Sequence, residues 1–311
     1  MHYQAWGSGD PVIALHPLAL ESTAFAGVAR ELTGRGLRTL AVDLPGFGRT
    51  PAPEGPLTSA VLAAPVIELA RELGENGAPP LLVGMSLGGR VAIEAALEAP
   101  ELFRGLVCVA PYLPWRRHAW MLPAARFMSP EFAEKIPLER IWPLLKRVAE
   151  GIEAREELEH DWLARASVRV IYYCSCPATR FALISAAREL ALDPALGPEG
   201  TWTRMRGLDL PAAFLWCGRD ALIPADHAEF VALELPRAQQ LELACSGHFV
   251  HGRHYCCFNR AVSDAVGSVV DAPRGARRRS ERAPIQCACL ADSDASEASV
   301  PALPGLVDSA R

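Results

Sequence analysis

The sequence predicts an α/β fold in which helices cover both faces of a mostly parallel central sheet, with a helical cap inserted into it. Over residues 11–109, short and almost wholly apolar runs alternate with segments of helical spacing. A G-x-S-x-G pentapeptide at 84–88 stands directly between one such run and one such segment. The alternation stops near residue 112 and resumes at residue 212, which indicates an insertion between two strands.

Composition and charge narrow the class of protein. The chain has 311 residues, of which 50% are hydrophobic, and its formal net charge is −5. This is enough apolar material for one large core, and the charge gives no reason to expect nucleic acid or an anionic membrane as a partner. No apolar run approaches the roughly 18–20 residues that a membrane-spanning helix needs. Residues 1–4 lack the features of a secretory signal, so a cytoplasmic protein is expected.

The first part of the chain alternates predicted strands with predicted helices. In chain order, strands are expected within 1–9 and at 11–15, 38–42, 81–85 and 106–109, and helices at 20–33, 57–73 and 90–98. Pro65 lies inside the second helix and predicts a kink or a break into two pieces there. From the strand at 11–15 onward, the order β-α-β-α-β-α-β is typical of parallel strands joined by helices.

Residues 112–204 lack strand periodicity and carry helical segments rich in tryptophan and arginine, which predicts a helical cap over the sheet. Ser129 before Pro130 is a good N-cap, and Cys176 before Pro177 could begin another helix in the same way. The aromatic residues of this region could line a pocket or form the cap's own core: Trp115, Trp120, Trp142, Trp162, Tyr172 and Tyr173.

The α/β pattern then returns, with strands expected at 212–217 and 240–244 and helices at 224–235 and 258–270. The predicted domains are therefore a core of residues 1–111 and 205–272 and a cap of residues 112–204. Residues 273–311 are rich in Ser, Ala, Asp and Pro and show no periodicity, so a disordered tail is expected there.

The pentapeptide Gly84–Gly88 is the first candidate for chemistry. A serine in a turn between a strand and a helix takes a tight, strained backbone conformation, so the residues two positions before and after it must be small. Gly84 and Gly88 meet this need, and the turn would place the Ser86 hydroxyl above the sheet edge, beside the Leu87 N–H. The pentapeptide also occurs in ordinary loops, but its strand and helix neighbours favour a nucleophile here.

A serine hydroxyl is a weak nucleophile at neutral pH, so it needs a general base, and the base needs a carboxylate that fixes its tautomer. Asp220 follows the apolar run 212–217, and His248 follows the run 240–244. The chain order Ser86, Asp220, His248 is the order expected when these residues stand at strand ends of one parallel sheet.

Five stretches now identify a family resemblance: VIALHP, VDLPGFGRT, VGMSLGGR, LWCGRDALIP and CSGHFVH. With these motifs in this order, residues 1–271 resemble the α/β-hydrolase superfamily, in its capped, esterase-like branch. The resemblance implies that Ser86 is the nucleophile, His248 the general base and acid, and Asp220 the orienting carboxylate. It also implies an oxyanion hole made by the backbone N–H groups of Leu18 and Leu87, and no cofactor. The chain departs from the family at Pro17, where the family usually has glycine after the histidine.

Other polar residues have simpler interpretations. His16 is expected to bond loop backbone, and Asp43, in DLPGFG, to shape its loop. His251 and His254 lie just past His248 and are weaker candidates for the base. Asp193 and Asp226 are interpreted as helix-terminus acids.

Pocket and metal candidates complete the inventory. Met85, Trp115 and Phe249 are candidates for the substrate pocket, and Trp115 begins a Trp-Arg-Arg-His cluster near the expected cap hinge. The cysteines do not make the paired CxxC pattern of a zinc site, so no metal is expected.

The expected function is that of a serine hydrolase that cleaves a small carboxylic ester or lactone through an acyl-enzyme. The same triad also serves hydrolases that cleave C–C bonds of ring-cleavage products, which stays an alternative. A non-catalytic binding protein on the same scaffold is a second alternative, because fold alone does not determine function.

Overall fold

The computed structural model describes residues 1–75, 77–114, 126–140, 142–153, 168, 170–218, 220, 222–223, 227–243, 248, 255–272 and 282–284. Within these residues, one eight-stranded sheet has the order β1-β3-β2-β4-β5-β6-β7-β8. Its strands are β1 (Tyr3–Trp6), β2 (Asp10–Leu15), β3 (Leu37–Val42), β4 (Leu81–Met85), β5 (Gly105–Val109), β6 (Ala212–Cys217), β7 (Gln239–Leu243) and β8 (Arg282–Pro284). β1 pairs antiparallel with β3, and the other neighbours are parallel. The predicted α/β fold with a mostly parallel sheet is confirmed.

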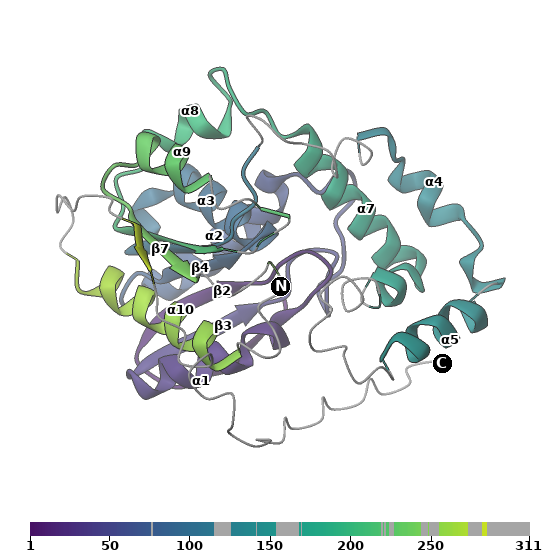
Figure 1. The fold of residues 1–311 in the computed structure, drawn as a ribbon, viewed down its shortest axis with the longest axis horizontal. Coiled ribbons are helices and arrows are strands. Elements are labelled where there is room, and N and C mark those ends of the chain that lie inside the picture. The colour runs from purple at the N-terminus through teal and green to yellow at the C-terminus, as the bar shows by residue number, and fades with distance from the viewer. Residues whose placement is uncertain are drawn as a thin grey trace.

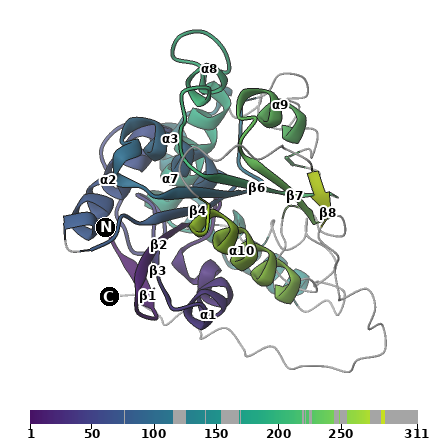
Figure 2. The same cartoon turned by 90° about the vertical axis from the view of Figure 1, so that its left-hand side faces the viewer.

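Helices cover the sheet on both faces (Figures 1 and 2). On one face lie α1 (Ala26–Gly34), preceded by the 3-10 turn η1 (Ser22–Phe25), and α10 (Tyr255–Val270). On the other lie α2 (Ser59–Glu75), α3 (Leu87–Glu98) and α9 (His227–Glu234), while the short turn η2 (Pro100–Leu102) leads from α3 into β5. With helices on either side, both faces of the central strands are shielded from water, which explains their continuous apolar sequences.

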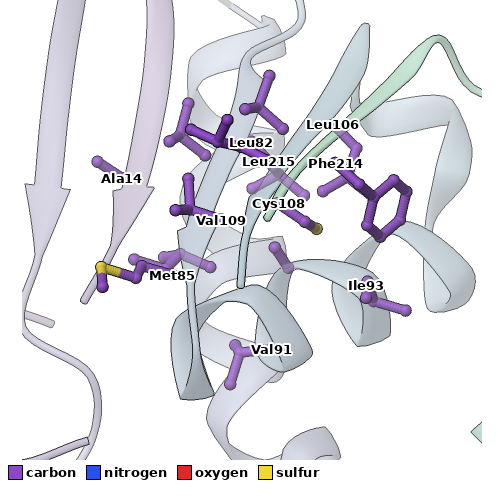
Figure 3. Packing of buried hydrophobic residues seen from close by; sticks show 14 of the residues in the cluster. Ala14, Leu82, Met85, Val91, Ile93, Leu106, Cys108, Val109, Phe214 and Leu215 are labelled. Carbon is purple, nitrogen blue, oxygen red and sulfur yellow. The ribbon is translucent and has the colours of Figure 1, made fainter. Parts of the chain in front are cut away.

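The hydrophobic core runs through the central strands. β4, β5 and β6 are buried along their whole length. Figure 3 shows Leu82 of β4, Cys108 and Val109 of β5 and Leu215 of β6 packed together, with Ile93 of α3 close by. Burial in this apolar setting raises the pKa of the Cys108 thiol far above its ordinary value, so Cys108 acts as a small hydrophobic side chain.

A helical insertion occupies the chain between β5 and β6 and lies to one side of the sheet (Figure 1). Its described elements are α4 (Pro130–Lys135), η4 (Leu138–Arg140), α5 (Trp142–Glu153), α7 (Pro177–Leu192) and α8 (Thr201–Met205). The predicted start of α4 is confirmed, because the Phe132 N–H donates to Ser129 Oγ at 3.1 Å with Pro130 in the first turn. The predicted start of α7 at Pro177 is confirmed as well.

Arg180 ties two of these helices together. This side chain of α7 is 2% exposed and donates to the backbone carbonyls of Ala133, Glu134 and Ile136 at 2.6–2.8 Å. These carbonyls lie at the C-terminal end of α4, where helix carbonyls lack partners within the helix and carry partial negative charge. One buried guanidinium therefore fixes α4 against α7.

Two expectations differ from the structure. Pro65 predicts a kink or a break; α2 is not broken there, because Leu62, Val66 and Leu69 on its inner face are anchored in the core. Within the predicted tail, β8 pairs in parallel with β7 and places Arg282 beside Gln240. Backbone pairing at an open sheet edge needs no apolar side-chain pattern, so this strand had no sequence signal. The rest of 273–311 lies outside the described residues.

Among the described residues, the helices are too short or too polar for any of them to cross a membrane.

Candidate active site

Ser86 stands in the sharp turn between β4 and α3. Its backbone has φ 53° and ψ −114°, a conformation that residues with a Cβ atom rarely adopt. The turn is held on both sides, since Ser86 N–H donates to Val109 O at 3.0 Å and Ser86 O accepts from Arg90 N–H at 3.0 Å. The strain is therefore supported by the neighbouring strand and by the first turn of α3.

The two glycines of the pentapeptide are required by close backbone contacts. A Cβ atom on Gly84 would lie 2.3 Å from Gly88 O, and one on Gly88 would lie 2.1 Å from Leu15 O. Both distances are far inside van der Waals contact, so strand β4, helix α3 and strand β2 can approach one another only where side chains are absent. This explains why small residues flank Ser86.

The structure brings the three predicted side chains together. His248 Nε2 lies 3.0 Å from Ser86 Oγ, and His248 Nδ1 lies 2.7 Å from Asp220 Oδ2. Asp220 is held by its other oxygen, Oδ1, which accepts from the N–H groups of Leu222 and Ile223 at 2.8 Å. With Nδ1–H donating to the carboxylate, Nε2 is left as an acceptor toward the serine hydroxyl, which is the arrangement a general base requires.

Two backbone amides are the predicted donors of an oxyanion hole. Leu87 is the first residue of α3, and helical hydrogen bonding leaves the N–H groups at that end without intrahelical acceptors. On the β2 side, residues Pro17–Leu20 form a turn that is closed by Leu20 N–H donating to Pro17 O at 3.3 Å. This closing bond uses the amide of Leu20, so the Leu18 N–H is not part of it. The oxyanion roles of Leu18 and Leu87 remain predictions.

His16 shapes that turn from inside the protein. The ring is fully buried, with Nδ1 2.8 Å from Pro17 O and Nε2 accepting from Leu44 N–H at 3.0 Å. Burial lowers the pKa of His16 to about 4, so the ring is neutral at pH 7. The interpretation of His16 as a loop-bonding residue is confirmed.

Asp43 has the predicted loop-shaping role. Its oxygens accept from Ser22 N–H at 2.7 Å and Arg49 N–H at 3.0 Å, and Oδ2 lies 2.6 Å from His2 Nδ1. Although burial alone would raise it, these hydrogen bonds hold the pKa of the Asp43 carboxyl below its ordinary value. Gly48 leaves room for the carboxylate, since a Cβ atom there would lie 2.4 Å from Asp43 Cγ.

The remaining candidates fall into two groups. Met85 is 1% exposed and belongs to the hydrophobic core, so its part in a pocket stays a prediction (Figure 3). Trp115 and Phe249 lie outside the described residues. The same holds for His251, His254, Asp226, Trp120 and Trp162.

Sequence reasoning missed an ionic network at the base of the insertion. Arg90, four residues after Ser86, is 2% exposed and donates to Asp193 at 2.5 and 3.2 Å and to Glu94 at 2.7 Å. The signal was present in the sequence, because Arg90 and Glu94 stand at i,i+4 on an otherwise apolar helix. Asp193 is the C-cap of α7, where the helix dipole disfavours an acid, and it is balanced there by Arg90.

A parallel sheet that brings a serine, a histidine and an aspartate into contact defines the class of α/β hydrolases. The model of one such family, described as the alpha/beta hydrolase family, matches residues 12–255. The chain belongs to this family, and it is a hydrolase.

Similar proteins agree with this assignment. A pimeloyl-[acyl-carrier protein] methyl ester esterase of Chromobacterium violaceum is 30% identical over 83% of this chain and 94% of its own length. One from Aeromonas salmonicida is 27% identical over 85% of this chain and 98% of its own length. Among solved structures, a malate-bound thermophilic esterase from Thermogutta terrifontis has a TM-score of 0.66 at 22% identity, covering 86% of this chain and 93% of that chain. The relatives place the chain among the carboxylic ester hydrolases.

The enol-lactonase from Burkholderia xenovorans LB400 shares the fold, with a TM-score of 0.63 at 17% identity over 86% of this chain and 96% of that chain.

Proposed function

We propose that the chain is a serine hydrolase that cleaves a small carboxylic ester through an acyl-enzyme on Ser86. The observation that carries the proposal is the continuous chain of contacts from Ser86 Oγ to His248 Nε2, at 3.0 Å, and from His248 Nδ1 to Asp220 Oδ2, at 2.7 Å. These distances are within hydrogen-bond reach, as a nucleophile, its base and an orienting carboxylate require. The site needs no cofactor for this reaction.

In the first half of the proposed reaction, Ser86 Oγ forms a bond to the ester carbonyl carbon while its proton passes to His248 Nε2. Asp220 stabilises the resulting imidazolium, and the N–H groups of Leu87 and Leu18 stabilise the oxyanion. The C–O bond to the alcohol then breaks, and the alcohol oxygen takes the proton from Nε2. In the second half, His248 removes a proton from water, whose oxygen bonds to the acyl carbon; the bond from that carbon to Ser86 Oγ then breaks, Oγ takes the proton back from Nε2, and the acid is released.

Substrate choice is proposed from the relatives. The curated relatives described above are named as methyl ester esterases, so a methyl ester of an acyl chain on a carrier protein is the first substrate to test. A lactone is a cyclic ester that the same steps would open. Cleavage of a C–C bond in a dienoic ring-cleavage acid is the alternative, and a panel containing all three compounds distinguishes them by which one the purified protein consumes.

Replacement of Ser86 by alanine tests the nucleophile. We expect Ser86→Ala to lower hydrolysis of a short p-nitrophenyl ester by at least about 10³-fold, because no other group then forms the acyl-enzyme. Ser268→Ala is the matched control, since that hydroxyl bonds Gln239 and the Ala265 carbonyl on α10, away from the triad. Circular dichroism checks that both variants fold. Wild-type rates in Ser86→Ala would contradict the proposal.

Replacement of Asp220 by asparagine tests the carboxylate. An asparagine cannot stabilise an imidazolium, and its amide would favour the wrong tautomer of His248, so kcat is expected to fall by about 10³–10⁴-fold. Labelling with a fluorophosphonate provides a second readout, because it requires an activated serine. A folded wild-type protein that does not label at Ser86 would support the non-catalytic binding protein instead.

A further inference from the structure

A tyrosine of the insertion reaches the turn that carries Leu18. Tyr173 lies in the helical residues 170–174 just before α7, and its hydroxyl donates to Leu20 O at 2.8 Å. Its ring packs on Phe47, with centroids 5.8 Å apart, and Phe47 in turn meets the His16 ring edge to face at 5.6 Å. The insertion is thereby in direct contact with the turn that follows His16, whose carbonyl oxygen would lie 2.7 Å from a Cβ atom on Gly88.

Hydrogen bonds from the core hold this turn at both of its ends. Before the turn, His16 bonds Pro17 O and Leu44 N–H, and after it, Ser22 N–H donates to Asp43 Oδ1 at 2.7 Å. Between these anchors Ala19 has φ 59°, a left-handed conformation that is unfavourable for a residue with a Cβ atom. A strained turn of this kind keeps its shape only when surrounding contacts enforce it.

Leu20 is where the contacts from the core and the insertion meet. Its N–H closes the turn on Pro17 O, and its C=O accepts the Tyr173 hydroxyl. With both peptide groups of Leu20 oriented, rotation about its backbone bonds is restricted, and the direction of the preceding amides is restricted with it. Removing the hydroxyl takes the Tyr173 hydrogen bond away from one of these two peptide groups.

We propose that Tyr173 is a positioning residue that couples the seating of the helical insertion to the shape of the oxyanion turn. The inference rests on the proposed function, in which Leu18 N–H stabilises the oxyanion. When the insertion is seated, Tyr173 holds Leu20 and the Leu18 amide is aligned with the transition state. When it is displaced, Ala19 can relax from its strained conformation and the amide loses this alignment.

The test is Tyr173→Phe, which removes one oxygen atom and keeps the ring on Phe47. For a short p-nitrophenyl ester, kcat is expected to fall about tenfold with KM changed less than about twofold. An alkyl boronic acid, whose adduct with Ser86 carries a tetrahedral anion, should bind about tenfold more weakly. A carboxylic acid product, which resembles the ground state, should bind as before.

Tyr112→Phe is the matched control, because the Tyr112 hydroxyl donates to Leu190 O of α7 at 2.7 Å, so this change also removes one hydroxyl contact with the insertion but does not involve the turn. It should leave kcat and boronic acid binding unchanged. The proposal is overturned if Tyr173→Phe binds the boronic acid like the wild type, or if both variants lose the same factor, which would indicate general loosening of the insertion. Thermal unfolding of each variant verifies folding. Activity that persists in Ser86→Ala would instead overturn the proposed function itself.

Discussion

The buried ring of His16 is kept neutral by its surroundings. Both ring nitrogens bond backbone groups, and the site is closed to water. Burial is the main cause that lowers the pKa of His16 to about 4 from 6.5, although the Pro17 carbonyl and the nearby Asp43 charge oppose the shift. The unfolded chain therefore takes up a proton at a pH where the folded chain does not.

This difference predicts a pH-dependent stability. As the pH falls from 6.5 to 4, the unfolded state binds more protons at His16 than the native state, so the free energy of unfolding decreases, by roughly 3 kcal/mol in total. His16→Gln removes the titrating group, and its stability should change less over this range. Urea unfolding of both proteins at several pH values between 4 and 8 measures the difference. Equal pH dependence in the two proteins would mean that His16 is not responsible.

The fold keeps Asp43 in its charged form, whereas it keeps His16 in its neutral form. Its folded pKa lies below the ordinary value of 3.8, so its hydrogen bonds contribute stability that is fully present above that pH. The contribution is lost as the pH falls from 3.8 through the folded pKa. The His16 effect therefore falls between pH 6.5 and about 4, and the Asp43 effect falls below pH 3.8. His16→Gln should alter the pH dependence of stability in the upper range.

At the scale of elements, local sequence signals predicted strands and helices well where the chain itself carried the pattern. The apolar run before Ser86 and the glycines around it predicted β4 and the start of α3 within a few residues. Pro65 predicted a kink or a break, but the packing of α2 on the core prevented a break. Strand β8 is formed by backbone pairing, which leaves no pattern among the side chains. The contacts among Ser86, Asp220 and His248 were predictable because parallel strands bring their carboxyl ends to one edge.

Gly88 provides a test of the close packing at the Ser86 turn. We expect Gly88→Ala to lower the free energy of unfolding by about 3 kcal/mol or more, because the new Cβ atom would lie 2.1 Å from Leu15 O and only backbone could move. Gly74→Ala in α2 is the control. A Cβ atom there meets nothing within 4 Å, so this change should stabilise the helix by about 0.5–1 kcal/mol. Urea unfolding measures both, and similar values for the two variants would contradict the packing argument.

At the scale of the whole molecule, the position of the insertion relative to the sheet decides the contacts that sequence could not predict. The Tyr173 hydroxyl meets Leu20 O, and Arg90 meets Asp193, across 153 and 103 residues of chain. Neither pair shares a strand register or a helical repeat that would bring its members together. Their meeting depends on how the insertion packs on the core, which no local pattern specifies.

The ionic network of Arg90 joins that insertion to helix α3. Asp193 at the end of α7 bonds Arg90, Arg90 bonds Glu94, and Glu94 accepts from Arg204 of α8 at 2.7 Å. The side chains of Arg90 and Glu94 are only 3% and 5% exposed. Charges this deeply buried are costly when unpaired, and the network therefore ties the C-terminal end of α7 to α3 through Asp193.

The exposed pair Arg237–Asp209 allows a controlled test of this network. Asp193→Asn should lower the free energy of unfolding by about 3 kcal/mol, since it leaves the Arg90 charge poorly compensated in a buried site. Asp209→Asn should cost less than about 1 kcal/mol, because its 3.0 Å ion pair has side chains 55% and 80% exposed. The double change Arg90→Met with Asp193→Leu should recover most of the lost stability, because both buried charges of that pair are then removed and Glu94 keeps Arg204 at 2.7 Å. If Asp193→Asn and Asp209→Asn cost the same in urea unfolding, the Arg90 network contributes no more than a surface ion pair, and other contacts of α7, such as the hydrogen bonds of Ser185 and Leu190, must hold it in place.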